Sequence, residues 1–154
     1  AKYEKMKREI RYEAFECDDA DLVVVAFGTI GRIAKSAVRA LRAKGTKVGL
    51  FRPITLFPFP SDALRDLAAK GKRFLTIEHN LGQMVEDVRL SVLPASDSDF
   101  FSVLPGNMPI PDDFEKPILA SLKGPAKAAG SRAKCAPKKP SAPGKGSVAK
   151  GKKG

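Results

Sequence analysis

The residues that could do chemistry fall in short segments that follow apolar runs of the chain. Gly28 to Arg32 is the first, and its Gly-x-x-Gly spacing resembles a phosphate-binding glycine turn. It lacks the third glycine of that motif, and Arg52 stands where an acid would end the next strand. Backbone N–H groups at a helix start can still hold an anion. Candidate anion-site residues are therefore Gly28, Thr29, Gly31 and Arg32, and a plain strand-to-helix turn is the alternative.

The other reactive residue types do not assemble into a known catalytic pattern. His79 is the only histidine, it lies beside Glu78, and no serine stands in a G-x-S-x-G context. Glu86 and Asp87 come early in a predicted helix, where they complement its dipole or act as paired carboxylates. The two cysteines lie far apart and form no C-x-x-C pair. The sequence thus predicts no catalytic residue and no metal site.

The stretch V-G-L-F-R-P-I-T-L-F-P-F-P at 48–60 connects one predicted strand to the next helix. Three prolines within residues 53–60 stiffen it, because each fixes its own φ and restricts its predecessor. We expect neither a helix nor a central strand beyond Phe51. Two interpretations stay open: a structural crossover with two core phenylalanines, or a surface that docks another domain or subunit.

Apolar periodicity predicts alternating strands and helices around a parallel sheet. The expected strands are 22–27, 47–51, 72–78 and a short 100–104; the expected helices are 30–44, one capped by Ser61, 83–92, and 112–122 broken or offset at Pro117. This pattern gives a three-layer α/β/α fold. In such sheets function gathers beyond the carboxyl ends of the strands, which here are followed by 28–32, 52–59 and 78–83.

The net charge of +11 is unevenly distributed. Residues 124–154 hold nine Lys or Arg and no acid, which leaves 19 basic against 17 acidic residues before them. We therefore predict three parts: a linker or leading helix at 1–20 from an absent upstream domain, an α/β domain at 21–123, and a disordered Lys/Ala/Pro/Gly-rich tail at 124–154. The tail either attracts nucleic acid weakly, as any polyanion, or is a solvated extension. Cysteine usage and the lack of a long apolar run favour a cytoplasmic protein without a membrane segment.

Five segments together resemble the C-terminal domain of the alpha subunit of 2-oxoacid:ferredoxin oxidoreductases. They are D-A-D-L-V-V-V-A-F-G at 19–28, R-I-A-K-S-A-V at 32–38, K-V-G-L-F-R-P-I-T-L-F-P-F-P at 47–60, K-R-F-L-T-I-E at 72–78 and G-Q-M-V-E-D-V-R-L at 82–90. The resemblance is closest to the branched-chain (2-oxoisovalerate) type, with the 2-oxoglutarate type next. His79 departs from it, because the family more usually has an apolar residue there.

The resemblance implies a transketolase C-terminal-like domain in a multisubunit enzyme. That enzyme converts a 2-oxoacid, CoA and oxidised ferredoxin to an acyl-CoA, CO2 and reduced ferredoxin. It uses thiamine diphosphate, Mg2+ and iron–sulfur clusters, none of which this chain alone is expected to bind. The expected partners are the upstream alpha-subunit domain, the beta and gamma subunits and a ferredoxin-like delta subunit.

On this interpretation the chain serves as scaffold and subunit interface. We expect Arg52 to reach across the interface while Phe57 and Phe59 pack beneath it. The full set of interface candidates is Arg52, Pro53, Thr55, Phe57, Phe59, Glu78, Gln83, Glu86 and Asp87.

Overall fold

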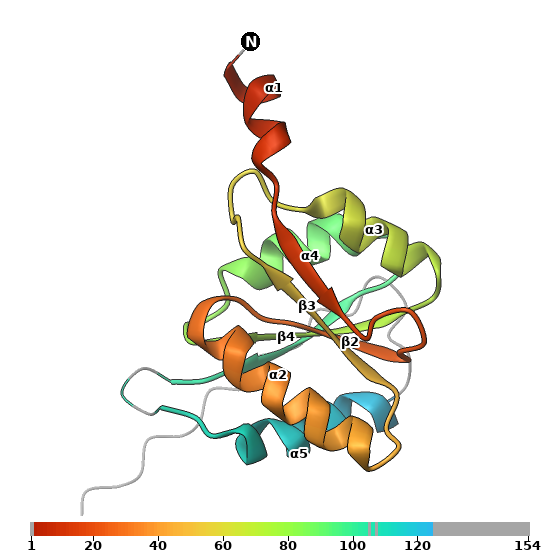
Figure 1. The fold of residues 1–154 in the computed structure, drawn as a ribbon. Coiled ribbons are helices and arrows are strands. Elements are labelled where there is room, and N and C mark those ends of the chain that lie inside the picture. Colours follow the sequence, from red (N-terminus) through yellow and green to blue (C-terminus); the bar gives the residue numbers. More distant parts are fainter. Residues whose placement is uncertain (1, 105, 107, 125–154) are drawn as a thin grey trace, which may run out of the picture.

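A computed structural model describes residues 2–104, 106 and 108–124; the predicted tail at 124–154 therefore lies outside the described residues except for Gly124. The described chain forms one five-stranded sheet with helices on both sides (Figure 1). The strands are β1 Tyr12–Phe15, β2 Leu22–Val25, β3 Val48–Pro53, β4 Arg73–Glu78 and β5 Ser98–Ser102. The helices are α1 Lys2–Met6, the 3-10 turn Lys7–Glu9, α2 Gly28–Ala43, α3 Ser61–Ala69, α4 Met84–Val92 and α5 Pro111–Lys123.

The sheet has the order β1-β3-β2-β4-β5, and the last four of these strands are mutually parallel. β2 lies in the middle, and all four of its residues are fully buried. Leu22 and Val24 face one core, whereas Val23 and Val25 face the other. A strand covered on both faces requires an unbroken apolar run, which explains why this segment was the easiest strand to predict.

Two hydrophobic cores fill the space between the sheet and its two helical layers. α2 and α5 contact each other on one face, and α3 and α4 contact each other on the opposite face. The first core includes Ala34 of α2 and Ile118 of α5, and the second includes Leu64 of α3 and Val88 of α4. The predicted three-layer α/β/α fold with a mainly parallel sheet is confirmed.

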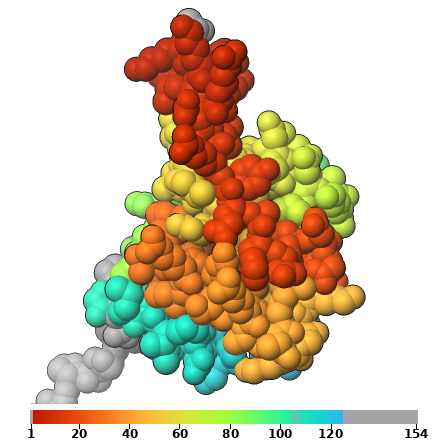
Figure 2. All heavy atoms as spheres, in the orientation of Figure 1, coloured from red at the N-terminus to blue at the C-terminus, as the bar shows by residue number. Residues whose placement is uncertain are grey.

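The first twenty residues differ from the predicted linker. α1 agrees with the expected leading helix and projects from the body of the molecule (Figure 2). β1, however, is an edge strand that pairs antiparallel with β3, from Tyr12 opposite Pro53 to Phe15 opposite Leu50. The sheet therefore begins before residue 21. β3 also runs two residues beyond Phe51, because β1 supplies a pairing partner there.

Three smaller predictions were wrong at the ends of elements. Ser61 is the first residue of α3 and makes no side-chain cap, because Pro60 takes the cap position. α5 continues through Pro117 without a break, since Phe114 and Ile118 on either side of it are fully buried. β5 spans 98–102 instead of 100–104.

Candidate functional site

The loops that leave β2, β3 and β4 gather at the carboxyl edge of the sheet. The chain leaving β2 enters α2 on one face and returns to β3, whereas the chain leaving β4 enters α4 on the other face and returns to β5. The two connections therefore diverge between the adjacent strands β2 and β4. Such a point of divergence is called a topological switch point, and open α/β sheets bind their ligands there.

Glu78, the last residue of β4, organises this point from within. Its side chain is fully buried. The carboxylate accepts hydrogen bonds from the backbone N–H groups of Met84 and Val85, at 2.8 Å each, and from the Asn80 amide at 3.0 Å. These N–H groups begin α4 and have no partner within the helix, and a negative charge there is favoured by the helix dipole. Glu78 therefore caps α4, and its interface role stays a prediction.

Asn80 fixes the loop between β4 and α4. Its Oδ1 accepts hydrogen bonds from the backbone N–H groups of Gly82 at 2.8 Å and Gln83 at 3.2 Å. Gly82 has φ +104°, a conformation that other residues adopt only with strain. His79 lies exposed in the same loop. The loop is thus held in one shape by contacts inside the chain.

A pocket of about 130 Å³ opens where these loops meet. We call it the switch-point pocket, and its lining residues are Phe27, Leu56, Glu78, Asn80, Gln83, Met84 and Asp87. Glu78, Gln83 and Asp87 were singled out from the sequence. Leu56 and Asn80 fall within the edge segments 52–59 and 78–83 but were not named individually. Phe27 and Met84 were missed, because apolar residues at a strand end or a helix start have the same sequence pattern as core residues.

Large apolar side chains stand exposed on the loops that line the switch-point pocket. We call these four residues the edge patch: Ile54, Leu56 and Phe57 after β3, and Leu81 after β4, with exposed fractions of 55, 45, 67 and 83%. Phe57 touches one other aromatic ring in the described chain, that of Tyr3 in α1, edge-on at 6.2 Å. Figure 2 shows the projecting N-terminal segment beside this part of the surface. Clustered exposed apolar residues mark surfaces that bind another protein.

Arg52 occupies a different position from the one expected. Its Nη1 donates to Glu13 Oε2 of β1 at 3.2 Å, and its aliphatic part packs over Gly31 of α2. Lys35 donates to the other oxygen of Glu13. Hydrogen bonds from Lys35 and Arg52 hold the pKa of Glu13 below its ordinary value of 4.5, despite partial burial that opposes the shift. Arg52 therefore binds the edge strand to the domain, and its reach across an interface stays a prediction.

The remaining interface candidates divide between the surface and the interior. Pro53 is buried in β3 opposite β1, and Phe59 is half-buried against the core that α3 and α4 cover. Thr55 accepts a hydrogen bond from the Arg11 N–H at 3.0 Å. Glu86 lies exposed and pairs with Arg89 at 3.4 Å. Of the two phenylalanines expected beneath Arg52, Phe59 packs inward and Phe57 points to solvent.

The predicted anion turn begins α2. Gly28 has φ +57°, and Thr29 and Arg32 are exposed on the first turns of the helix. Gly31 is buried, and a Cβ at this position would lie 2.9 Å from the Ala26 carbonyl oxygen. Packing alone explains the glycine at position 31, because a side chain would not fit there. Anion binding by this turn stays a prediction.

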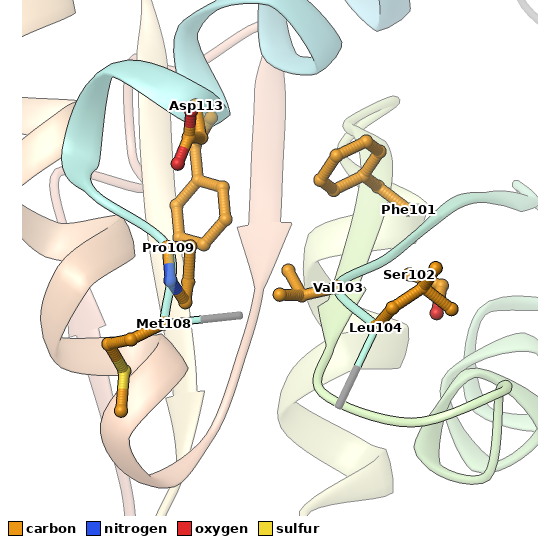
Figure 3. Close-up of a pocket in the computed structure, with 8 residues that line it drawn as sticks. Phe101, Ser102, Val103, Leu104, Met108, Pro109 and Asp113 are labelled. Carbon is orange, nitrogen blue, oxygen red and sulfur yellow. The ribbon is translucent and has the colours of Figure 1, made fainter. Parts of the chain in front are cut away.

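A larger space of about 360 Å³ lies between the end of β5 and the start of α5 (Figure 3). Phe101 and Val103 line one side, and Pro109, Asp113 and the buried Phe114 line the other. The rings of Phe101 and Phe114 meet edge-on at 6.4 Å. The site is mainly apolar, and the sequence analysis did not single out any of its residues.

Comparison with known proteins connects this geometry to a family. Residues 20–114 match the model of the pyruvate:ferredoxin oxidoreductase core domain II. The chain belongs to this family. It is 53% identical over 91 residues to the ketoisovalerate oxidoreductase subunit VorB of Methanothermobacter thermautotrophicus, covering 58% of this chain and 26% of that protein. It is 37% identical over 118 residues to the 2-oxoglutarate synthase subunit KorA of Methanocaldococcus jannaschii, covering 77% and 32%. The chain thus spans about a quarter to a third of these relatives.

Two solved structures share the fold of this family member. One is the 2-oxoglutarate:ferredoxin oxidoreductase from Magnetococcus marinus with 2-oxoglutarate, coenzyme A and succinyl-CoA bound, at TM-score 0.66 and 20% identity. It matches 73% of this chain and 20% of that one. The other is a split-gene transketolase in an inactive beta4 tetramer, at TM-score 0.61 and 18% identity, which matches 73% of this chain and 41% of that one. The expected transketolase-like fold is confirmed.

The family's cofactors do not fit the residues in view. Among residues 2–104, 106 and 108–124, no three His, Cys, Asp or Glu side chains gather as a metal ion or cluster would require. The switch-point pocket contains buried Glu78 and exposed Asp87, which would repel a diphosphate. We therefore derive no chemical step for this domain.

No helix in the described chain is long and apolar enough to span a membrane.

Proposed function

We propose that this chain is the C-terminal structural and subunit-interface domain of the alpha subunit of a thiamine-diphosphate-dependent 2-oxoacid:ferredoxin oxidoreductase. The reaction of the whole enzyme converts a 2-oxoacid, CoA and oxidised ferredoxin to an acyl-CoA, CO2 and reduced ferredoxin. Thiamine diphosphate, Mg2+ and iron–sulfur clusters would be bound outside the described residues. The 53% identity to the VorB subunit carries this proposal and favours a branched-chain 2-oxoacid as substrate.

The edge patch supports the interface role. Leu81 and Phe57 expose 83% and 67% of their surface, although both lie on loops that Asn80 and three prolines hold stiffly. Exposed apolar groups contribute nothing to folding of the domain, and burying them favours association by about 25 cal/mol per Å². We place the upstream alpha-subunit domain or a beta or gamma subunit against this patch. A cytoplasmic location fits ferredoxin as the electron acceptor.

Reconstitution of the complex tests the proposal. The full alpha subunit that contains this chain is co-expressed with beta and gamma subunits, and assembly is measured by size-exclusion chromatography with light scattering. Reduction of ferredoxin is then followed with 2-oxoisovalerate and CoA. Failure to assemble, or assembly without any 2-oxoacid-dependent reduction, would refute the proposal.

The 2-oxoglutarate type is the alternative, because the KorA relative matches more of this chain than VorB does. The same assay separates the two types. A kcat/KM for 2-oxoglutarate above that for 2-oxoisovalerate would assign the enzyme to the 2-oxoglutarate type.

A further inference from the structure

The switch-point pocket has the size of a single side chain. Pockets for cofactors and drug-sized molecules range from about 300 to 1,000 Å³. At about 130 Å³ this pocket is well below that range. One water takes up about 30 Å³ in the liquid, so the pocket holds a group about as large as four waters. A long amino-acid side chain is such a group, and a nucleotide is not.

The pocket has apolar walls and acidic polar groups. Phe27, Leu56 and Met84 supply the apolar walls. The buried carboxylate of Glu78 is already occupied by three donors from its own chain. The carboxylate of Asp87 differs, because it is exposed and no basic side chain of the described residues pairs with it. An anionic ligand would meet two carboxylates here, whereas a cation would find one of them unpaired.

We propose that the switch-point pocket receives one Arg or Lys side chain from the beta or gamma subunit that covers the edge patch; the inference rests on the proposed function. Such side chains lay their methylene groups along apolar surface and carry the charge at the tip. The stem packs against Leu56, Phe27 and Met84, and the cation reaches Asp87. Gln83 stands at the same opening and offers its amide oxygen as a second acceptor.

The surroundings favour this kind of anchor. Interfaces draw most of their affinity from a few residues, Arg among them, that are ringed by apolar contacts which exclude water. Leu56 brings the edge patch to the wall of the pocket, and Ile54, Phe57 and Leu81 expose further apolar surface on the loops that line it. Excluding water strengthens the attraction between the incoming cation and Asp87, since the effective dielectric constant falls.

Asp87→Asn and Asp87→Lys in the full alpha subunit test the inference. Asp62 offers the matched control, because it stands in the first turn of α3 as Asp87 does in α4, and its side chain is 92% exposed. The dissociation constant for the beta and gamma subunits is measured by biolayer interferometry at 50 and 300 mM NaCl. We expect Asp87→Asn to raise it at least tenfold at low salt, Asp87→Lys to raise it further, and Asp62→Asn to change it less than twofold. The Asp87 effect should shrink at high salt.

The outcomes separate this inference from the proposed function. If the wild-type subunit binds its partners and the Asp87 variants bind as tightly as the Asp62 variant, the pocket inference is wrong and the proposed function stands. If the wild-type subunit does not bind, both are wrong. Circular dichroism melting confirms that each variant is folded. Leu56→Ser is the second probe, and it should weaken binding equally at both salt concentrations because it removes an apolar wall and no charge.

Discussion

The cap that Glu78 places on α4 gives the sharpest stability prediction. Glu78→Gln keeps the size of the side chain and replaces one carboxylate oxygen by an NH2 group. In the wild type each carboxylate oxygen accepts one backbone N–H of α4, from Met84 and from Val85. Glutamine has one acceptor, so one of these buried N–H groups would face another donor.

The expected loss can be worked out from these contacts. A buried donor left without a partner costs about 1 to 3 kcal/mol. Removing a negative charge from a helix N-terminus costs up to about 1 kcal/mol more. We therefore expect Glu78→Gln to lower the free energy of unfolding by about 1 to 4 kcal/mol. With a urea dependence of about 2 kcal/mol per M, the unfolding midpoint should fall by about 0.5 to 2 M.

Urea unfolding of the whole chain, followed by far-ultraviolet circular dichroism, measures this midpoint. Glu86→Gln is the matched control: it makes the same chemical change in the first turn of the helix that Glu78 caps, but the Glu86 side chain is 69% exposed and, among the described residues, pairs only with Arg89. Exposed pairs of this kind contribute less than about 1 kcal/mol. Equal midpoints for Glu78→Gln and Glu86→Gln would refute the capping role of Glu78.

Four further predictions concern other parts of the chain. Burial raises the pKa of the Cys17 thiol to about 11. In a Cys135→Ser background, Cys17 should therefore react with iodoacetamide at pH 8 far more slowly in the native chain than in the urea-unfolded chain. Mass spectrometry of the alkylated protein measures this difference. Folding lowers the pKa of Glu13. The ionised Glu13 therefore contributes to stability above pH 4.5, and this contribution is lost as the pH falls through the folded-state pKa. We expect Glu13→Gln to flatten the decline of the melting temperature in acid. Gly49→Ala would place a Cβ 2.6 Å from a backbone carbonyl oxygen, and we expect a loss of about 1 to 3 kcal/mol in urea unfolding. Deleting 124–154 should abolish any binding of the chain to DNA at 50 mM salt in a gel-shift assay; unchanged binding would contradict the polyanion role of the tail.

The central fold was predictable because burial on both faces leaves a simple pattern. Only an unbroken apolar run such as Leu22–Val25 satisfies a strand between two helical layers. The edge strand β1 carries no such pattern. Glu13 and Phe15 are half-buried, whereas Tyr12 and Ala14 are exposed on the opposite face of the sheet, where Tyr12 stacks with Phe51. Among the described residues, the Glu13 carboxylate is held by Arg52 and Lys35, which lie far along the chain, so local sequence could not reveal the strand.

The sequence predicted where the candidate site lies, but only some of the residues that line it. The carboxyl edge follows from the alternation of strands and helices, and Gln83 and Asp87 do line the pocket there. The capping role of Glu78 was not predicted, because a glutamate at the end of a strand has the same sequence signal whether it faces a partner or caps the next helix. Its role depends on the direction of two N–H groups six and seven residues later, which only the folded loop determines.

The stretch at 48–60 contains phenylalanines in both of the situations that its sequence left open, one in the core and one exposed at the surface. Phe51 is fully buried and stacks with Tyr12 at 4.9 Å, so it belongs to the core. Phe57, six residues later, leaves two thirds of its surface in water. The core does not need this ring, and its exposure adds nothing to folding stability. Pro53, between the two phenylalanines, and Pro58, directly after Phe57, prevent the loop from continuing as a strand or a helix. Phe57 therefore lies exposed on the loop that also carries Leu56 to the switch-point pocket. A crossover built only for stability would bury both rings, and the exposed ring supports the proposal that this stretch docks a partner.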